Sequence, residues 1–424
     1  MRIVYRLTWR LAAPLVFIYF LWRSRREPAY RQDWAQRLGY VPKTLPTDAI
    51  WIHAASVGEV QAITPVLEGL LDQCPGHPIV VTTMTPGGRG RLHARFGSQV
   101  HHGYIPLDLP GAVRRFLDRL KPSMGVIVEM ELWPELLSAA HNRGIPLSLV
   151  NARLSEVTLR RYQRLASLFR PCLGCFDWIA AQTSEDADRL LRLGGSQASL
   201  AITGNIKFDQ PLAIEQIRAG EALRDQLGNS RPIWAAVSTR QGEDDLVLAA
   251  MERIRATHPE AGLILVPRHP QRFDAVAALI KQHGYALVSR SGDESPTAAT
   301  AVYLGDSMGE MLYYMAAADV VFVGGSLVAL GGHNLLEPAA LGKPLLAGPY
   351  RFNFAAISEL LDAAGALTTV HDQQELAEAT TALLAAGERR RAMGTAAYHC
   401  VQSNQGARER VIDGLCAQLG NRQA

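Results

Sequence analysis

A glutamate near the start of an amphipathic segment is a candidate acid–base group. Glu59 lies in HAASVGEV, residues 53–60, directly after the apolar run 50–53. A carboxylate at the end of such a strand can remove a proton from a hydroxyl group, provided that burial raises its pKa toward the working pH. The alternative is structural, because a glutamate in a first helical turn also caps the helix. The residues alone leave both roles open.

Two further carboxylates follow another apolar run. The segment VEMELWPEL, residues 128–136, places Glu129 and Glu131 directly after residues 126–128. Such a pair at the end of a buried strand is unfavourable unless it binds a positive group or shares a proton. The alternative is that Glu131 and Pro134 merely open the next helix.

Basic residues follow several other apolar runs and indicate an anion site. An activated sugar carries a phosphate leaving group, and an acidic sugar adds a carboxylate, so a site for such a donor needs fixed positive charge. Lys207 in GNIKFD and Arg268 in PRHP are the preferred cations. An Arg-His pair after a strand is otherwise most often a surface pair.

The segment 305–350 has the pattern of a nucleotide pocket. A short acidic loop precedes the apolar run 320–323, and two glycine clusters follow it. Asn334 can then cap a helix from about residue 335, whose first-turn amides favour phosphate. Glu337 in that turn can accept hydrogen bonds from ribose hydroxyls. The alternative is that Glu337 is only a favourable N-terminal charge and the glycines only form a loop.

The elements that position these residues alternate along the chain. With 424 residues the chain exceeds one hydrophobic core, so we expect two domains. Short apolar runs alternate with longer amphipathic stretches, which predicts an α/β fold of two doubly wound domains that face a central cleft. The predicted strands are residues 50–53, 79–82, 101–106, 126–128, 147–150, 178–181 and 200–203 in the first domain, and 233–237, 263–266, 286–289, 301–304, 320–323, 344–346 and 366–369 in the second. The polar segment 208–231 is the expected linker.

Several functional classes are disfavoured. The chain has no GxxxxGK[ST] motif and no GxGxxG after its first strand, which disfavours P-loop ATPases and dehydrogenases. It has no HExxH, and we expect no metal or other cofactor. Residues 1–37 hold eight arginines against two acidic residues, while the net charge of the whole chain is only +3. The excess positive charge therefore belongs to the N-terminus, and we expect no nucleic-acid partner.

The N-terminus predicts a membrane anchor. Residues 11–22 are uncharged and are flanked by arginines on both sides. Crossing a bilayer takes roughly 20 apolar residues, so this segment fits either a short span or a helix in the membrane surface. The arginines suit anionic phospholipid at the cytoplasmic face. We expect an uncleaved anchor with the rest of the chain in the cytoplasm.

In combination, these motifs resemble the 3-deoxy-D-manno-octulosonic acid (Kdo) transferases of lipid A biosynthesis, a family of membrane-associated glycosyltransferases with the two-domain GT-B fold. The resemblance extends over nearly the whole chain. Its segments, in order, are HAASVGEV at 53–60, TTMTP at 82–86, VEMELWP at 128–134, VNARLS at 150–155, GNIKFD at 204–209, PRHP at 267–270, GDSMGEM at 305–311 and GGHNLLEP at 331–338.

The resemblance implies the transfer of Kdo from CMP-Kdo to a lipid A precursor (lipid IVA), with inversion at the anomeric carbon, at the cytoplasmic face of a bacterial inner membrane. It implies that Glu59 is the general base and that Glu129 and Lys207 support the transition state. The implied CMP site consists of Arg268, His269, Met308, Gly309, Glu310, Asn334, Leu335, Leu336 and Glu337. We expect an anchor over residues 1–30, an acceptor-binding domain over 31–207 and a CMP-sugar-binding domain over 208–424. The alternatives are a sugar-nucleotide 2-epimerase of the same two-domain fold and a non-catalytic membrane-associated nucleotide-sugar binder.

Overall fold

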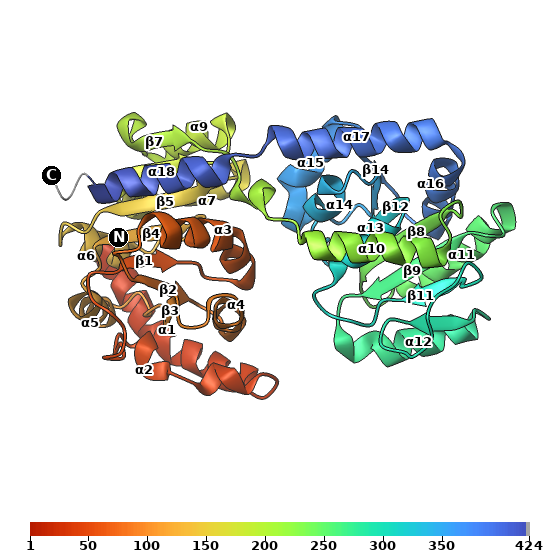
Figure 1. The fold of residues 1–424 in the computed structure, drawn as a ribbon. Coiled ribbons are helices and arrows are strands. Elements are labelled where there is room, and N and C mark those ends of the chain that lie inside the picture. The colour runs from red at the N-terminus through yellow and green to blue at the C-terminus, as the bar shows by residue number, and fades with distance from the viewer. Residues whose placement is uncertain (421–424) are drawn as a thin grey trace. The chain divides into compact units, whose positions relative to one another are not determined.

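The computed structural model describes residues 1–420, which form two compact units (Figure 1). The first unit contains Met1–Gln210 and the C-terminal stretch from Gln405, and the second contains Pro211–Asn404. Each unit is built around a parallel seven-stranded sheet. The α/β class and the two doubly wound domains expected from the sequence are therefore confirmed.

The first sheet has the strand order β3-β2-β1-β4-β5-β6-β7. Its strands, all parallel, are β1 (Ile50–His53), β2 (Ile79–Thr83), β3 (His101–Tyr104), β4 (Met124–Val128), β5 (Leu147–Ala152), β6 (Trp178–Ala181) and β7 (Leu200–Ile202). Each corresponds to a predicted strand, with ends that differ by a few residues. The order runs outward in both directions from β1 and β4, as in a doubly wound fold.

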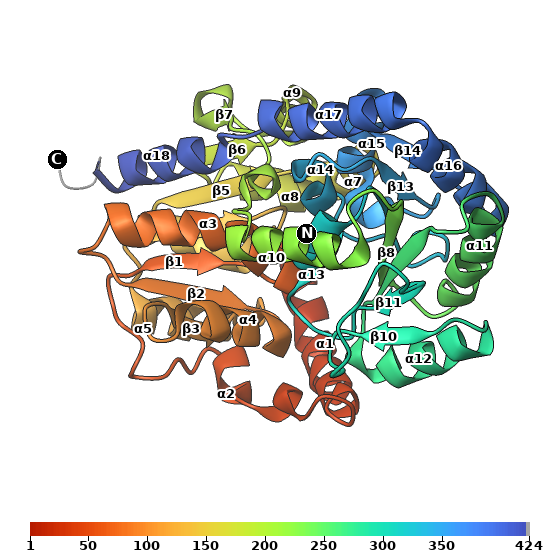
Figure 2. The same ribbon diagram turned by 45° about the vertical axis from the view of Figure 1, so that its right-hand side comes forward.

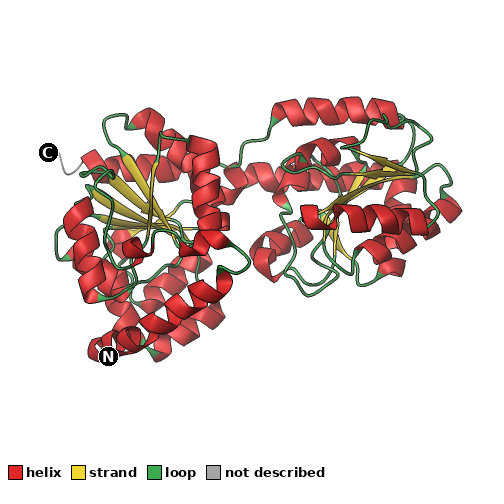
Figure 3. Ribbon diagram, turned by 90° about the horizontal axis from the view of Figure 1, so that it is seen from below, coloured by secondary structure: helices red, strands yellow, loops and turns green. Residues whose placement is uncertain are grey.

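Helices cover both faces of this sheet (Figure 3). One face packs on α3 (Val57–Gln73), α4 (Pro86–Phe96) and α18 (Ala407–Gly420). The other packs on α5 (Pro110–Leu120), α6 (Pro134–His141), α7 (Glu156–Arg164), α8 (Ala166–Leu173) and α9 (Ser184–Leu193). Because side chains alternate along a strand, Ile50 and Ile52 join the α3 side, while Trp51 faces the other side and contacts the ring of Phe116.

The second sheet has the order β10-β11-β9-β8-β12-β13-β14. Its strands are β8 (Ile233–Thr239), β9 (Gly262–Pro267), β10 (Leu287–Ser289), β11 (Val302–Leu304), β12 (Val320–Val323), β13 (Leu345–Ala347) and β14 (Leu367–Thr369). The helices of this unit are α10 (Ile214–Leu227), α11 (Asp244–Thr257), α12 (Phe273–Gln282), α13 (Met311–Ala317), α14 (Leu336–Ala340), α15 (Ala355–Ala363), α16 (Gln373–Ala385) and α17 (Gly387–Ser403). One face of the sheet packs its apolar side chains on α11, α12 and α16.

The helix expected to link the domains is instead part of the second unit. Most of the polar segment 208–231 forms α10, which lies against α13 (Figure 2). The approach is close at Gly220, where a Cβ atom would lie 2.4 Å from the carbonyl oxygen of Tyr313. Packing rather than polarity therefore decides the place of this segment.

The last helix differs from the expected domain division, which assigned residues 208–424 to one domain. In Figure 1, α18 lies alongside α3 in the first unit. Val411, Ile412 and Leu415 of α18 join the apolar core on that side of the sheet. The carboxylate of Asp209 accepts hydrogen bonds from the backbone N–H groups of Gly406 (2.7 Å) and Arg408 (2.8 Å) and so fixes the start of the helix.

The N-terminus forms one helix, α1 (Arg2–Arg23), followed by the short helix α2 (Trp34–Arg37). By length and composition α1 could cross a membrane, and only 11% of its most apolar 18-residue stretch is buried within the protein. Its exposed apolar side chains include Ile3, Leu7, Leu11, Leu15 and Ile18. This feature is compatible with the membrane association expected from the sequence.

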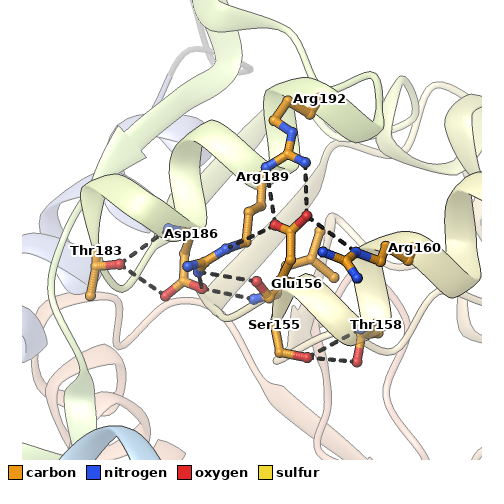
Figure 4. A network of polar contacts seen from close by, with 9 residues as sticks. Ser155, Glu156, Thr158, Arg160, Thr183, Asp186, Arg189 and Arg192 are labelled. Atoms are coloured by element: carbon orange, nitrogen blue, oxygen red, sulfur yellow. Dashed lines mark hydrogen bonds and ion pairs between the residues drawn. The ribbon is translucent and has the colours of Figure 1, made fainter. Parts of the chain in front are cut away.

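Ion pairs hold the segment that follows β5 (Figure 4). The carboxylate of Glu156, the first residue of α7, contacts Arg192 of α9 at 2.9 Å and also lies near Arg160 and Arg189. Asp186 of α9 accepts a hydrogen bond (2.9 Å) from the backbone N–H of Leu154. These contacts fix the chain as it leaves the sheet beside Asn151.

Candidate active site

The candidate acid–base residues of the first unit lie where its strand order reverses. Strands β1 and β4 are neighbours at the centre of the sheet, and their connections leave in opposite directions. Ligands of doubly wound sheets bind at the carboxyl ends of the strands at such a point. Glu59 follows β1 and Glu129 follows β4, so the fold brings these two predicted residues together.

Glu59 lies in the first turn of α3 and forms a capping box with Ser56. Its backbone N–H donates to Ser56 Oγ (3.2 Å), and Ser56 Oγ donates to Glu59 Oε1 (2.8 Å). The backbone N–H of Ala55 donates to Glu59 Oε2 (2.7 Å). The interpretation of Glu59 as a helix-capping residue is therefore correct. These hydrogen bonds also hold its carboxylate in one place.

The environment of Glu59 also suits a base. Burial raises the pKa of Glu59 to about 7 despite the hydrogen bonds from Ser56 and Ala55, and the carboxylates of Glu129 and Glu131 raise it further. A general base works best when its pKa is near the working pH. The same side chain thus caps a helix and has the protonation behaviour of a base, so the two readings of the sequence do not exclude each other.

Glu129 has the cationic partner that its position requires. Lys207 Nζ lies 2.9 Å from Glu129 Oε1, and both side chains are about one-third exposed. Glu129 has a left-handed backbone with φ of 59°, which is uncommon for a residue other than glycine. Strained residues of this kind concentrate at functional sites, because the surrounding structure must hold them in place.

Asn151 places the segment that carries Lys207. Its backbone is also left-handed, with φ of 55°, and its Oδ1 accepts a hydrogen bond (3.2 Å) from the backbone N–H of Ile206. Asn205 Oδ1 accepts from the backbone N–H of Lys207 (3.0 Å). Asn151 belongs to the segment VNARLS of the sequence resemblance, but its contact with a residue 55 positions away is visible only in the folded chain.

Glu131 is held by a tryptophan. The indole N–H of Trp133 donates to Glu131 Oε2 at 2.8 Å. Burial raises the pKa of Glu131, the neighbouring carboxylate of Glu129 raises it further, and the hydrogen bond from Trp133 lowers it. Pro134 opens α6, as the structural reading of this segment predicted.

The second unit has a cluster of basic residues at the carboxyl ends of its strands. We define the basic cluster as Arg240 after β8, Arg268 and His269 after β9, and His333 in the loop after β12. Strands β9, β8 and β12 are adjacent, so their carboxyl ends lie together. Burial lowers the pKa of His333 to about 4, and Arg268, Arg240 and His269 lower it further.

The basic cluster is available to an anion. Neither Arg240 nor Arg268 makes an ion pair with another residue in the described part of the chain. Within residues 1–420, His333 Nε2 is buried and has no hydrogen-bond partner. Fixed positive charge without a carboxylate partner is the arrangement that a phosphate or carboxylate ligand needs.

A buried carboxylate that sequence reasoning missed holds the glycine loop beside this cluster. Glu243 is fully buried and accepts backbone hydrogen bonds from Gly325 (2.6 Å), Ser326 (2.9 Å) and Leu327 (2.9 Å). It also accepts one from the backbone N–H of Arg240 (2.9 Å). The one feature of the sequence that could have indicated Glu243 is its position in QGEDD, soon after the end of a predicted strand.

The predicted loop 308–310 follows β11, next to β9. Met308 is exposed, and Gly309 has φ of 82° and accepts a hydrogen bond (2.8 Å) from Gln216. Glu310 pairs with Arg290 through two hydrogen bonds of 3.0 and 2.8 Å, and the hydrogen bond from Arg290 lowers the pKa of Glu310. Because Arg290 offsets its charge, Glu310 repels a nearby phosphate less than a free carboxylate would.

The helix expected from about residue 335 is present and short. Helix α14 spans only Leu336–Ala340, and Asn334 Oδ1 caps it by accepting from the backbone N–H of Leu336 (3.0 Å). Leu335 and Leu336 are buried, and Glu337 lies in the single turn. One turn has a small dipole, so the positive charge at this edge comes mainly from the basic cluster.

Two family models match the chain. The model described as 3-Deoxy-D-manno-octulosonic-acid transferase (kdotransferase) matches residues 32–210, and the one described as Glycosyl transferases group 1 matches residues 243–399. Each match lies within one of the two units of the structure.

Curated relatives match over almost the whole chain. The 3-deoxy-D-manno-octulosonic acid transferase of Haemophilus influenzae is 40% identical over 406 residues, which cover 95% of each chain. The enzyme of the same name from Bordetella pertussis is 39% identical and covers 98% of this chain and 99% of its own. Among solved structures, the UDP-GlcNAc 2-epimerase from Neisseria meningitidis bound to UDP-GlcNAc aligns with a TM-score of 0.59, covering 87% of this chain and 100% of its own. At 15% identity this last likeness concerns the two-domain fold alone.

Proposed function

Because this chain belongs to the family of 3-deoxy-D-manno-octulosonic acid transferases, we propose that it transfers Kdo from CMP-Kdo to a lipid A precursor, lipid IVA. It is a glycosyltransferase, as its curated relatives are. The observation that carries the proposal is Glu59, a fixed carboxylate at the reversal point of the first sheet whose pKa is raised to about 7.

In the proposed reaction Glu59 removes the proton from a hydroxyl group of the acceptor sugar. That oxygen attacks the anomeric carbon of Kdo from the side opposite to CMP, the bond from that carbon to the phosphate oxygen of CMP breaks, and CMP leaves with the bonding electrons. Configuration is therefore inverted. General-base assistance of this kind contributes roughly 10²- to 10⁴-fold to the rate.

Glu129 and Lys207 support the transition state in this proposal. Lys207 offsets negative charge on the Kdo carboxylate or the departing phosphate, and Glu129 orients Lys207 through the 2.9 Å ion pair. Preorganised charges of this kind stabilise a transition state because no reorganisation is needed during the reaction. The left-handed backbone of Glu129 supports this role, since a strained residue must be held by its surroundings.

The second unit binds the CMP part of the donor in this proposal. Arg268 and His269 meet the phosphate, Arg240 adds further positive charge, and the neutral imidazole of His333 offers its Nε2, which has no hydrogen-bond partner within residues 1–420. The loop with Met308, Gly309 and Glu310 and the turn from Asn334 through Leu335 and Leu336 to Glu337 provide the contacts to ribose and cytosine. No metal or other cofactor has a part, because the basic cluster supplies the positive charge that the leaving phosphate needs.

The membrane is the proposed location of the acceptor. The exposed apolar side of α1 and the arginines at 23, 25 and 26 suit the cytoplasmic face of a bacterial inner membrane with anionic phospholipid. Holding the enzyme on the surface that contains the lipid raises their effective concentration. A 2-epimerase of soluble sugar nucleotides would have no use for such a helix.

The test is to incubate the protein with CMP-Kdo and lipid IVA and to measure CMP release and lipid mass. We expect Kdo mass increments in the lipid, and we expect Glu59→Gln to abolish them while CMP still binds. Glu185→Gln is the matched control, because Glu185 is an exposed first-turn glutamate of α9 in the same unit. Absence of transfer by the unaltered protein would refute the proposed function, and full activity of Glu59→Gln would refute the role of Glu59.

A further inference from the structure

The N-terminal helix has two unlike sides. Leu7, Leu11 and Leu15 are at least half exposed, at 52%, 78% and 65%, and form the side that we propose for the membrane. The opposite side of its N-terminal half consists of Arg2, Tyr5, Arg6 and Trp9, and every one of these side chains contacts another part of the first unit. The helix is therefore both a candidate anchor and a docked element of the fold.

This docked side of α1 contacts the first turn of α6. Arg6 makes two hydrogen bonds to the carboxylate of Glu135, at 2.7 and 2.9 Å, and the Glu135 side chain is only 7% exposed. Tyr5 Oη donates to Asp108 Oδ2 at 2.7 Å. The same Asp108 carboxylate accepts from the backbone N–H groups of Glu135 (3.0 Å) and Leu136 (2.8 Å). One buried carboxylate thus joins α1 to the first turn of α6.

The contact continues from α1 to a carboxylate of the candidate active site. The ring of Trp9 lies 6.0 Å from the ring of Trp133, centroid to centroid. Trp133 directly precedes α6, and its indole N–H donates to Glu131 Oε2 at 2.8 Å. Trp133 therefore touches the anchor helix with its ring and Glu131 with its N–H group.

Glu131 needs such a partner. It is partly buried, and the carboxylate of Glu129, two residues away, repels its charge. The charged groups in this region are Glu129, Glu131 and Lys207. Burial raises the pKa of the Tyr162 phenol on α7, and the carboxylate of Glu131 raises it further. Without the hydrogen bond from the indole N–H, an ionised Glu131 would be lower in free energy if it turned to solvent or took up a proton.

We propose that α1 positions the loop of the candidate active site, with Trp9 holding Trp133 and Trp133 holding Glu131. The inference rests on the proposed transferase function and adds Trp9, Trp133 and Glu131 to it as positioning residues. The helix thus has a second role that does not depend on the membrane. Docking of α1 on α6 fixes the carboxylates that lie within electrostatic reach of Glu59.

The test separates this role from membrane attachment by dispersing the lipid acceptor in detergent. Trp133→Phe keeps a ring and removes the N–H group, Trp9→Ala removes the ring contact, and Trp9→Phe retains it. Trp22→Ala is the matched control, because Trp22 lies on the same helix and is 53% exposed. Each variant is first compared with the unaltered protein for its content of folded protein by circular dichroism.

We expect Trp133→Phe and Trp9→Ala to lower kcat about tenfold or more, since a 1 Å misplacement at an active site can cost roughly 100-fold. The acid limb of their pH–rate profiles should move to lower pH, because a Glu131 that is protonated or turned away repels the charge of Glu59 less. Trp9→Phe should restore most of the activity, and Trp22→Ala should leave both rate and profile unchanged. If activity falls only in proportion to folded protein, with the acid limb in place, α1 merely stabilises the fold and the inference is overturned.

A second measurement does not depend on turnover. Each of the seven tryptophans has one indole N–H group that ¹⁵N NMR can observe, and the signal lost in Trp133→Phe is that of Trp133. In the intact protein that signal should follow the titration of Glu131, and Glu131→Gln should abolish the response. Trp9→Ala should weaken the response, whereas a response unchanged by Trp9→Ala would overturn the positioning role. A protein without turnover but with this response would refute the transferase function and leave the positioning role standing.

Discussion

Lowering the pH should inactivate the enzyme at a higher pH than an ordinary glutamate base would require. Burial raises the pKa of Glu59 to about 7 from its usual value of 4.5, and only the ionised form can accept the acceptor's proton. Activity is therefore present above the raised pKa of Glu59 and is lost as the pH falls through it. At pH 6 about one-tenth of Glu59 is ionised, so kcat/KM should be about tenfold below its plateau, and at pH 5 about 100-fold below it.

The assay is CMP release from CMP-Kdo with lipid IVA in detergent, measured between pH 5 and pH 9. His333 does not confuse the result, because burial lowers its pKa to about 4, below the range of the assay. Burial raises the pKa of Asp108 to about 6, so folding is checked by circular dichroism at each pH. If kcat/KM at pH 6 stays within twofold of its value at pH 8 while the protein is folded, an ordinary pKa describes the base and the reasoning about burial is wrong.

Three further predictions concern other parts of the molecule. Lys207→Met should lower kcat by about 100-fold and leave the CMP affinity measured by calorimetry unchanged. The loss of the partly exposed ion pair between Lys207 and Glu129 should reduce the free energy of unfolding by about 1 kcal/mol or less. Arg268→Ala should weaken CMP binding by roughly 10- to 100-fold, since a hydrogen bond to a charged group contributes about 1.5–3 kcal/mol, and binding unchanged in calorimetry would remove Arg268 from the site. Gly220→Val should lower the unfolding free energy by about 1–3 kcal/mol, because the new Cβ would meet the carbonyl oxygen of Tyr313, and a thermal midpoint equal to that of the unaltered protein would contradict this packing.

The strands were predictable because parallel strands buried on both faces are short apolar runs between polar segments. All runs named from the sequence became strands, with ends shifted by a few residues. The errors arose where packing overrides local composition. Most of the polar segment 208–231 packs as α10, and α18 returns to the first unit because its apolar side covers α3.

The site was predictable where function follows from position after a strand. Glu59 and Glu129 meet at the strand reversal because Glu129 directly follows β4 and Glu59 lies in the first turn of the helix after β1. The role of Glu243 was not predicted, since a carboxylate that binds backbone N–H groups 82 to 84 residues away has no local signature. A tryptophan that touches both α1 and Glu131 is likewise visible only when distant segments are brought together.

The return of α18 has a consequence for how the protein is made. Helix α3 is not covered by α18 until residues 407–420 leave the ribosome, although the rest of the first unit is complete at Gln210. At roughly 5–20 residues per second, the intervening chain takes on the order of 10–40 s to synthesise. During this interval the surface later covered by Val411, Ile412 and Leu415 is open to water and to other chains. A nascent chain of this protein should therefore present a chaperone site on α3 that disappears only when α18 has emerged and packed on it.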